Sequence, residues 1–376
     1  MIAARTYLDY NASAPLRPEA REAMLRALDV TGNPSSVHWE GRRARALVDT
    51  AREEIARLVN AKPAEVIFTS GATEANAWVM SAGWVAIAAS LFEHDSVLAP
   101  ARAAHARLIS LAVSETGLVE EDELVRGLDE VAATGRRALL TLQLANNETG
   151  VLQPVPHAAA LARERGLLTH TDAVQALGRV AVDMRALGAD FMSLSSHKIG
   201  GPTGAGALIV REGSELRPLI VGGGQERRRR AGTESVAAIA GFGAAAAAAA
   251  RDLPGMSRIR ALRDALENEV LSLTPKARVI GAGADRLVNT SCIALPGAKA
   301  ETLVIKLDLA GIAVSAGAAC SSGKVGASHV LSAMGLAPEV AASAIRVSLG
   351  HATREDDIGR FLAAWKEIAA GARLAA

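Results

Sequence analysis

The chain has 376 residues, 50% of them hydrophobic, and its 41 basic residues nearly balance 40 acidic ones, for a net charge of +1. A chain of this length buries a sizeable core and divides into two domains or into one large domain with a smaller one. The balanced charge provides no broad cationic field, which excludes nucleic acid and an anionic membrane as main partners and favours a small molecule or another protein.

In chain order, the first fifteen residues, MIAARTYLDYNASAP, lack the apolar core of a signal peptide. An amphipathic helix is predicted at 41–59 and another at 156–166. The most apolar run, at 78–92, contains serine and glycine and is shorter than the ~18 residues expected of a membrane span. We therefore expect a cytoplasmic protein in which this run lies in the interior.

Short β-branched or apolar runs alternate with these helical patterns, which is typical of parallel strands joined by crossover helices. The runs predicted as strands are 65–70, 137–145, 166–172, 190–196 and 206–210. The alanine run at 244–250 predicts a helix, and the Leu-Pro-Gly sequence at 253–255 predicts a boundary after it. We expect an α/β fold with a large domain at 13–253 and a smaller domain at 254–376 that includes residues 1–12.

A glycine turn follows the first predicted strand and opens a helix with the sequence GATEAN. The NH groups of Gly71, Ala72 and Thr73, with the Thr73 hydroxyl, are suited to bind an anion at this helix start. The alternative is an ordinary helix cap without a ligand.

A carboxylate closes the strand predicted at 166–172. This residue, Asp172, needs a cation or several donors if it is buried, and Gln175 follows three residues later. The alternative is that Asp172 only caps the next helix.

The sequence SLSSHKIGGPTGAG puts Ser195, His197 and Lys198 at another predicted strand end, before a glycine-rich turn. A lysine beside glycines is usually a solvated loop residue. Together with Asp172 and the helix start, however, Lys198 meets the needs of pyridoxal phosphate: a Schiff-base amine, an acid for the pyridinium nitrogen and a phosphate site.

The sequence resembles the cysteine desulfurases of the NifS type, within the class V aminotransferase group of pyridoxal phosphate enzymes, over nearly its whole length. The matching segments are YLDYNASAP, GNPSS, FTSGATEAN, EHDSVL, NNETG, HTDAVQ, SSHKIGGPTGAG, GGGQE, RAGT, SAGAACSSGK and IRVSLG. The resemblance implies a fold-type-I transferase, with a mainly parallel sheet flanked by helices and a smaller C-terminal α+β domain. It also implies a homodimer with shared active sites.

The same resemblance implies roles for individual residues. Lys198 would form the Schiff base and later move protons, Asp172 would keep the ring nitrogen protonated, and Gln175 would hydrogen-bond the ring hydroxyl. His94 would lie over the ring, with His105 as a competing candidate. The implied phosphate ligands are Ala72, Thr73, Ser195, His197 and, from a second subunit, Thr233.

For the substrate, L-cysteine, the resemblance implies a carboxylate clamp of Arg346, assisted by Asn147. Without it, Arg346 is equally well explained as a structural ion pair and Asn147 as a turn residue. The Cys320 thiolate would take the substrate's sulfur, leaving L-alanine and a persulfide for an acceptor such as an iron–sulfur scaffold protein. Cys292, in an apolar run, is expected to be buried. Two cysteines so far apart predict no disulfide framework and no metal site.

One segment departs from the family pattern, because Arg228 in QERRRRAGT stands where glycine is common. Arginine tolerates a positive φ poorly, so the backbone of this turn is in question. The four arginines are interpreted as a solvated face or as part of a phosphate entrance, and a nucleic-acid patch is ranked last.

Two other kinds of function remain in view. A selenocysteine lyase or an aminotransferase is the nearest alternative, although a transaminase needs no thiol at position 320. A noncatalytic sulfur-carrying or regulatory protein is a different class, and the intact set of Lys198, Asp172 and Arg346 argues against it.

Overall fold

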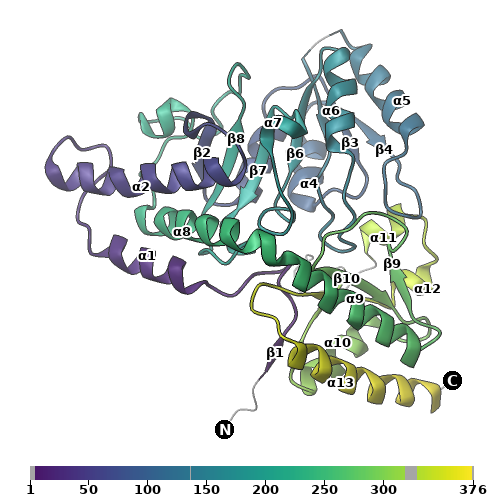
Figure 1. Cartoon of the computed structure of the whole chain (residues 1–376). Coiled ribbons are helices and arrows are strands. Elements are labelled where there is room, and N and C mark those ends of the chain that lie inside the picture. The colour runs from purple at the N-terminus through teal and green to yellow at the C-terminus, as the bar shows by residue number, and fades with distance from the viewer. Residues whose placement is uncertain (1–4, 136, 318–327, 375–376) are drawn as a thin grey trace.

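The computed structural model describes residues 5–135, 137–317 and 328–374, with side chains as far as residue 370. A seven-stranded sheet occupies the upper part of the molecule in Figure 1, in the order β2-β8-β7-β6-β5-β3-β4. Its strands are β2 (Val66–Thr69), β3 (Ala86–Ser90), β4 (Arg107–Leu111), β5 (Ala138–Thr141), β6 (Leu168–Asp172), β7 (Phe191–Ser195) and β8 (Gly206–Val210). Strands β3 to β7 are parallel to one another, which confirms the predicted α/β fold with a mainly parallel sheet.

Strand β8 differs from the expectation, because it runs antiparallel to both of its neighbours, β7 and β2. Only residues 196–205 connect β7 to β8, and they contain a short 3₁₀ turn, η2 (Ser196–Lys198), instead of a crossover helix. A parallel connection needs a dozen or more residues, so this link returns the chain in the opposite direction.

Helices cover both faces of the sheet because alternate strand residues point to opposite sides. One face packs against α2 (Trp39–Leu58), α5 (Glu121–Ala132), α6 (Val155–Glu164), α7 (Met184–Leu187) and α8 (Val236–Asp252). The other packs against α3 (Ala72–Met80) and α4 (Asp95–Ala103). In β5, for example, Leu140 belongs to the first core and Leu139 to the second.

A smaller antiparallel sheet lies in the lower right of Figure 1, in the order β12-β13-β10-β9. Its strands are β9 (Arg278–Ile280), β10 (Thr290–Ala294), β12 (Ser315–Ala316) and β13 (Ala344–Ser348). The helices α9 (Met256–Leu273), α10 (Ala300–Leu309) and α13 (Glu355–Leu374) share a separate core with it. The short helices α11 (His329–Ala333) and α12 (Pro338–Ala341) pack instead into the core of the large sheet.

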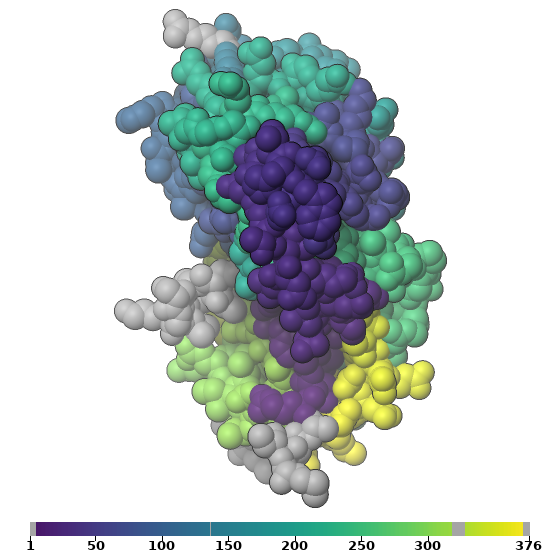
Figure 2. Space-filling view, turned by 90° about the vertical axis from the view of Figure 1, so that its left-hand side faces the viewer, coloured from purple at the N-terminus to yellow at the C-terminus, as the bar shows by residue number. Residues whose placement is uncertain are grey.

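The N-terminal segment runs between these two parts. Strand β1 (Thr6–Tyr7) pairs in parallel with β11 (Ile312–Ala313), and α1 (Pro18–Leu28) packs on α8. In Figure 2 the purple N-terminal residues lie along the middle of the face, with teal residues above them and yellow C-terminal residues beside their lower end. Residues 6–13 are thus close to both sheets.

The remaining regular segments are the 3₁₀ turns η1 (Pro63–Glu65), η3 (Gln225–Arg228) and η4 (Leu253–Gly255), the last of which follows α8 as predicted. The run Val236–Leu273, α8 through α9, is long and apolar enough to cross a membrane by length and composition alone. Half of its most apolar window is buried inside the fold, which is the pattern of a core helix. Such a run is weak evidence of a membrane span.

Candidate active site

A cavity of about 400 Å³ opens where the parallel strands end. Ligands bind at this edge of open α/β sheets because the carboxyl ends of several strands meet there. Ten of the residues singled out from the sequence line it: Gly71, Ala72, Thr73, His94, Asn147, Asp172, Gln175, Ser195, His197 and Lys198. They lie at the ends of β2, β3, β5, β6 and β7 or in the segments that follow these strands.

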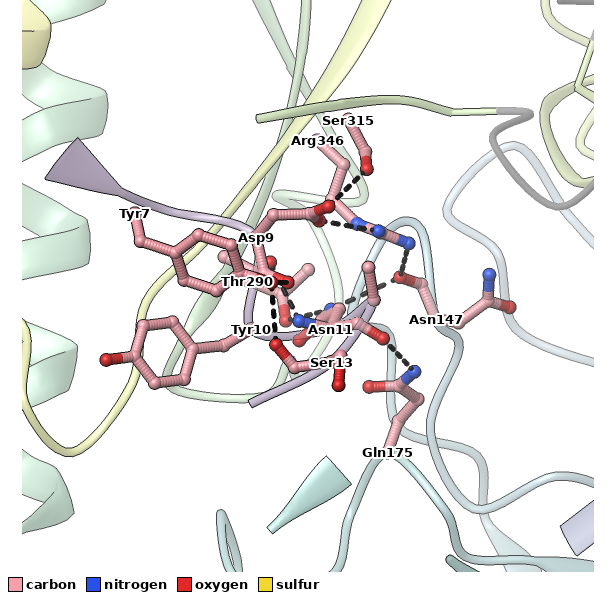
Figure 3. Close-up of polar contacts among 12 residues, drawn as sticks. Tyr7, Asp9, Tyr10, Asn11, Ser13, Asn147, Gln175, Thr290, Ser315 and Arg346 are labelled. Atoms are coloured by element: carbon pink, nitrogen blue, oxygen red, sulfur yellow. Dashed lines mark hydrogen bonds and ion pairs between the residues drawn. The ribbon is translucent and has the colours of Figure 1, made fainter. Parts of the chain in front are cut away.

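Lys198, the last residue of η2, points its amine at the N-terminal segment. Its Nζ donates to the backbone carbonyl of Asn11 at 2.6 Å and to that of Ala12 at 2.9 Å. The Asn11 carbonyl also accepts from Gln175 Nε2 at 3.0 Å, as Figure 3 shows. Residues 11–12 therefore hold the Lys198 and Gln175 side chains at one wall of the cavity.

Asn11 itself is held by two strands of the smaller sheet and by the segment that follows β5. Its side-chain Nδ2 donates to Thr290 Oγ1 at 2.9 Å and to the Asn147 carbonyl at 3.2 Å. Its backbone NH donates to Ser348 Oγ at 3.0 Å. The position of Lys198 thus depends on β10 and β13 as well as on the large sheet.

Asp172 ends β6 and is buried, with two neutral donors on its carboxylate. Asn76 Nδ2 donates to one oxygen at 2.7 Å and the Val174 NH donates to the other at 3.0 Å. These bonds fix the direction of the carboxylate. Nearby Glu93 is fully buried, and burial, with the Asp172 charge as a second cause, raises the pKa of Glu93 well above its usual value.

His94 caps α4 and lines the cavity. Its Nδ1 accepts from the Ser96 NH at 3.1 Å, which places the proton of the neutral ring on Nε2. Burial lowers the pKa of His94, so the ring is neutral at pH 7. His105, the competing candidate, is exposed and does not line the cavity.

The predicted anion site combines a helix start with the η2 turn. Helix α3 begins at Ala72, and Ala72 and Thr73 lie in the cavity wall together with Ser195 and His197. Burial first, and then the Lys198 charge, lower the pKa of His197 to about 4, so it offers a neutral ring there. Thr233 is exposed and does not line this chain's own cavity.

Arg346 lies behind the cavity wall instead of in it. It is 2% exposed, pairs with Asp9 at 2.8 Å through Nη2 and donates through Nη1 to the Asn147 carbonyl at 3.1 Å. Figure 3 shows this guanidinium between Asp9 and Asn147, and Ser315 Oγ donates to the same aspartate. The residue that meets the cavity is Asn147.

The arginine-rich turn has the backbone strain that the sequence raised as a question. Glu226, Arg227 and Arg228 have φ values of 45°, 56° and 65°. Glu226 is buried and accepts two hydrogen bonds of 2.8 Å from Arg52. At the other end of the turn, Arg230 pairs with Glu74 on α3 at 2.9 Å. Two ion pairs thus hold the strained turn beside β2 and the start of α3.

Of the two cysteines, only Cys292 lies within the described residues. Cys292 lies on β10 with no exposed surface, and burial raises the pKa of its thiol far above the usual value, so it is a structural residue as predicted. Cys320, the predicted nucleophile, lies outside the described residues.

Sequence reasoning missed several functional neighbours. Three polar residues lie beside the predicted site residues: Asn76, Ser96 and Gln143. The first two lie inside the quoted motifs FTSGATEAN and EHDSVL, and this position could have identified them as site residues. Asn11 lies inside the quoted segment YLDYNASAP, although its bond to Lys198 could not be read from it, and Arg179 lies in none of the quoted segments.

Comparison with known proteins identifies the family. Residues 6–361 match the family described as Aminotransferase class-V. The chain belongs to this family. Class-V aminotransferases work with pyridoxal phosphate, and the large sheet with its two helical layers is the fold-type-I architecture expected of them.

The similar class-V proteins include several cysteine desulfurases. The chain is 44% identical over 367 residues to a cysteine desulfurase of Cereibacter sphaeroides, covering 95% of this chain and 94% of the relative. It is 38% identical to the cysteine desulfurase IscS of Dictyoglomus turgidum, covering 94% and 91%. Among solved structures, a NifS-like protein from Rickettsia africae has a TM-score of 0.89 at 35% identity and covers 97% of this chain and 99% of its own.

The cavity fits pyridoxal phosphate by the chemistry of its donors. An amine, a carboxylate with its direction fixed by two NH donors, and a helix start beside a neutral histidine line one space. Lys198, Asp172 and Ala72–Thr73 are thus available for the aldehyde, the ring nitrogen and the phosphate of one molecule.

Proposed function

We propose that this protein is a pyridoxal phosphate-dependent cysteine desulfurase, which converts L-cysteine to L-alanine and transfers the sulfur to a cysteine of its own chain. The observation that carries the proposal is that Lys198, Asp172 and the start of α3 line a single cavity. Its support is the similarity to cysteine desulfurases at 38–44% identity over nearly the whole chain.

Bound pyridoxal phosphate supplies an electron-withdrawing ring that stabilises negative charge at the α-carbon of an amino acid. Lys198 would hold the cofactor at its aldehyde carbon, and its Nζ would be the group that takes the α-proton of the substrate. The Asp172 carboxylate, which Asn76 and Val174 keep in place, holds a proton on the ring nitrogen. Ala72, Thr73, Ser195 and His197 bind the phosphate.

The substrate carboxylate is held by Asn147 and Arg346 together. Asn147 lines the cavity, whereas Arg346 is buried behind it with Asp9 as its ion-pair partner. Arg346 Nε has no hydrogen-bond partner among the described residues, which leaves it able to donate further. In this arrangement Asn147 makes the first contact and Arg346 provides the positive charge.

Cys320 is the proposed sulfur acceptor within the chain. A thiolate is the nucleophilic form of cysteine, and Cys292 is fully buried with a raised pKa, so it is unsuited to this role. The persulfide on Cys320 then passes to an acceptor protein, with iron–sulfur cluster assembly in the cytoplasm as the proposed use. We also propose a large unit at 13–253 and a smaller one at 254–376 with residues 1–12.

The proposed homodimer explains the position of Thr233. This residue is exposed in the single chain, and the apolar side chains of Leu219 and Val221, on the segment that leads to it, are 44% and 80% exposed. A second subunit would cover this surface and receive Thr233 at its own phosphate site. Light scattering at the assay concentration tests this: a fully active monomer contradicts it.

The decisive experiment is to incubate the purified protein with L-cysteine and a reductant and to measure sulfide and alanine together. Equal amounts of both are expected from the wild-type protein and neither from Lys198→Ala. Cys320→Ser should bind cofactor and cysteine but lose sulfur release by orders of magnitude, because serine is almost fully protonated at neutral pH.

The matched control is Cys292→Ser, which should retain the chemistry and lose stability. Normal sulfide release by Cys320→Ser, or a persulfide found only on Cys292, would contradict the proposal. Selenide release from L-selenocysteine without sulfide release from L-cysteine would favour the selenocysteine lyase. Transfer of the amino group to an added oxo acid would favour the aminotransferase.

A further inference from the structure

Arg179 is a buried arginine that none of the proposed catalytic roles uses. It is 6% exposed, and its Nη1 donates to the backbone carbonyl of Gln175 at 2.7 Å and also to Gln175 Oε1. Its Nη2 donates to the Tyr10 carbonyl at 3.1 Å. No carboxylate in the described part of the chain lies within ion-pair distance of it, so all of these partners are neutral oxygens.

This guanidinium carries its charge at neutral pH. Burial, and secondarily the positive charge of Arg346, lower the pKa of Arg179 to about 9, which is still above 7. A buried cation without a carboxylate partner costs free energy. Such a cost calls for a function, and Gln175, the side chain that Arg179 contacts, lines the cavity.

The contacts of Gln175 determine which way its amide points. A guanidinium can only donate, so the amide oxygen must face Arg179. A backbone carbonyl can only accept, so the amide nitrogen must face the Asn11 carbonyl, at 3.0 Å. With its oxygen turned toward Arg179 and one of its two NH hydrogens left over, Gln175 offers the cavity a donor.

A donor of this kind selects for the charge of its ligand. It binds an oxyanion more strongly than a hydroxyl, which would compete to donate its own hydrogen. The buried charge of Arg179 behind the amide adds to the same preference. This wall of the cavity is therefore built for an oxygen that has lost its proton.

We propose that Arg179 is a positioning residue that turns Gln175 into a donor and thereby keeps the ring hydroxyl of the bound cofactor in its oxyanion form. The inference rests on the proposed function, since it assigns this wall to the ring oxygen. The proposal has a consequence for the proton affinity of the neighbouring Lys198 nitrogen, which shares a proton with the ring oxygen. A donor and a cation beside the ring oxygen both disfavour this shared proton, so they lower that affinity.

Other charges face this end of the cavity and are held constant in the test. The titratable and charged groups are Asp172 on β6, His197 and Lys198 on η2, His94 before α4, and Arg346 and Asp9 behind Asn147. Gln175 Oε1 accepts its bond from Arg179.

The experiment is a pH titration of the visible absorption band of the holoenzyme without substrate. In Arg179→Met the titration midpoint should rise by about one pH unit, a tenfold change in the proton affinity of the Lys198 nitrogen. Gln175→Ala should raise it in the same direction, and the double variant should rise by less than the sum of the two single changes, because Arg179 acts partly through Gln175 and partly through its charge. Arg179→Lys keeps the charge and should recover part of the shift.

The matched control is Arg263→Met, which also removes a buried arginine but one on α9 that donates to the Leu287 carbonyl. It should lower stability and leave the midpoint unchanged. If circular dichroism shows that Arg179→Met does not fold, the titration midpoint of Arg179→Lys is compared with that of the wild type instead. It should lie between the midpoints of the wild type and Gln175→Ala.

An unchanged midpoint in the Arg179 variants, or shifts that add fully in the double variant, would overturn this inference while leaving the proposed function intact. A wild-type protein that shows no cofactor band bound through Lys198 would overturn both.

Discussion

Replacing Glu148 with glutamine should stabilise the protein at alkaline pH and have little effect at acid pH. Glu148 is 3% exposed, and Ser328 Oγ donates to its Oε2 at 2.6 Å. Burial raises its pKa from 4.5 to about 7, which the Ser328 hydrogen bond and the Arg346 charge only partly oppose. Glutamine has nearly the same shape and keeps an oxygen for Ser328, but it has no charge to bury.

The expected size follows from linkage. A rise of the pKa from 4.5 to about 7 corresponds to roughly 3 kcal/mol, at about 1.4 kcal/mol for each pKa unit. Because the pKa of Glu148 is higher in the folded state, its contribution to the free energy of unfolding is fully present below pH 4.5 and is lost as the pH rises through about 7. The free energy of unfolding of Glu148→Gln does not fall in this way.

The assay is thermal unfolding of wild type and Glu148→Gln between about pH 5 and pH 8.5. The difference in Tm should grow toward alkaline pH by on the order of 5 °C, in favour of the variant. Glu339→Gln, an exposed change on the neighbouring helix α12, is the control and should show no such growth. A constant Tm difference across this range would refute the reasoning.

Three further outcomes are expected. Gly243→Ala should lower Tm by an amount equivalent to about 1–3 kcal/mol, because its new Cβ would lie 2.5 Å from Ala51 Cα. An unchanged Tm would contradict this, since it would mean that α8 can shift away from α2 to make room for the methyl group. Glu226→Gln should lower the urea midpoint by the equivalent of about 3–5 kcal/mol, because Arg52 would be left as a buried charge without its partner; an unchanged midpoint contradicts this. Iodoacetamide should label Cys292 only after unfolding, and mass spectrometry of the native protein would detect the opposite.

Much of the cavity could be predicted because its residues follow strands. Asp172 and Lys198 come directly after apolar runs, and the carboxyl ends of parallel strands converge, so local patterns located them. The antiparallel direction of β8 was not predicted, since an apolar run has the same sequence pattern in either direction.

Contacts that join distant parts of the chain could not be inferred from spacing. Asn11 meets Lys198 across 187 residues and Thr290 across 279, and neither pairing leaves a local signal. The buried position of Arg346, with Asp9 as its partner, also depends on the packing of the N-terminal segment against β13. The predicted roles of Thr233 and Cys320 stay predictions, the latter because Cys320 lies outside the described residues.

The contacts of Asn11 set the order in which the protein can mature during synthesis. This residue is synthesised 337 positions before Ser348, which is one of the partners that hold it. The large sheet can assemble earlier from residues 66–210, but the wall that orients Lys198 waits for β13. A nascent chain that stops before residue 344 therefore contains every strand of the large sheet, but its cofactor site is not complete.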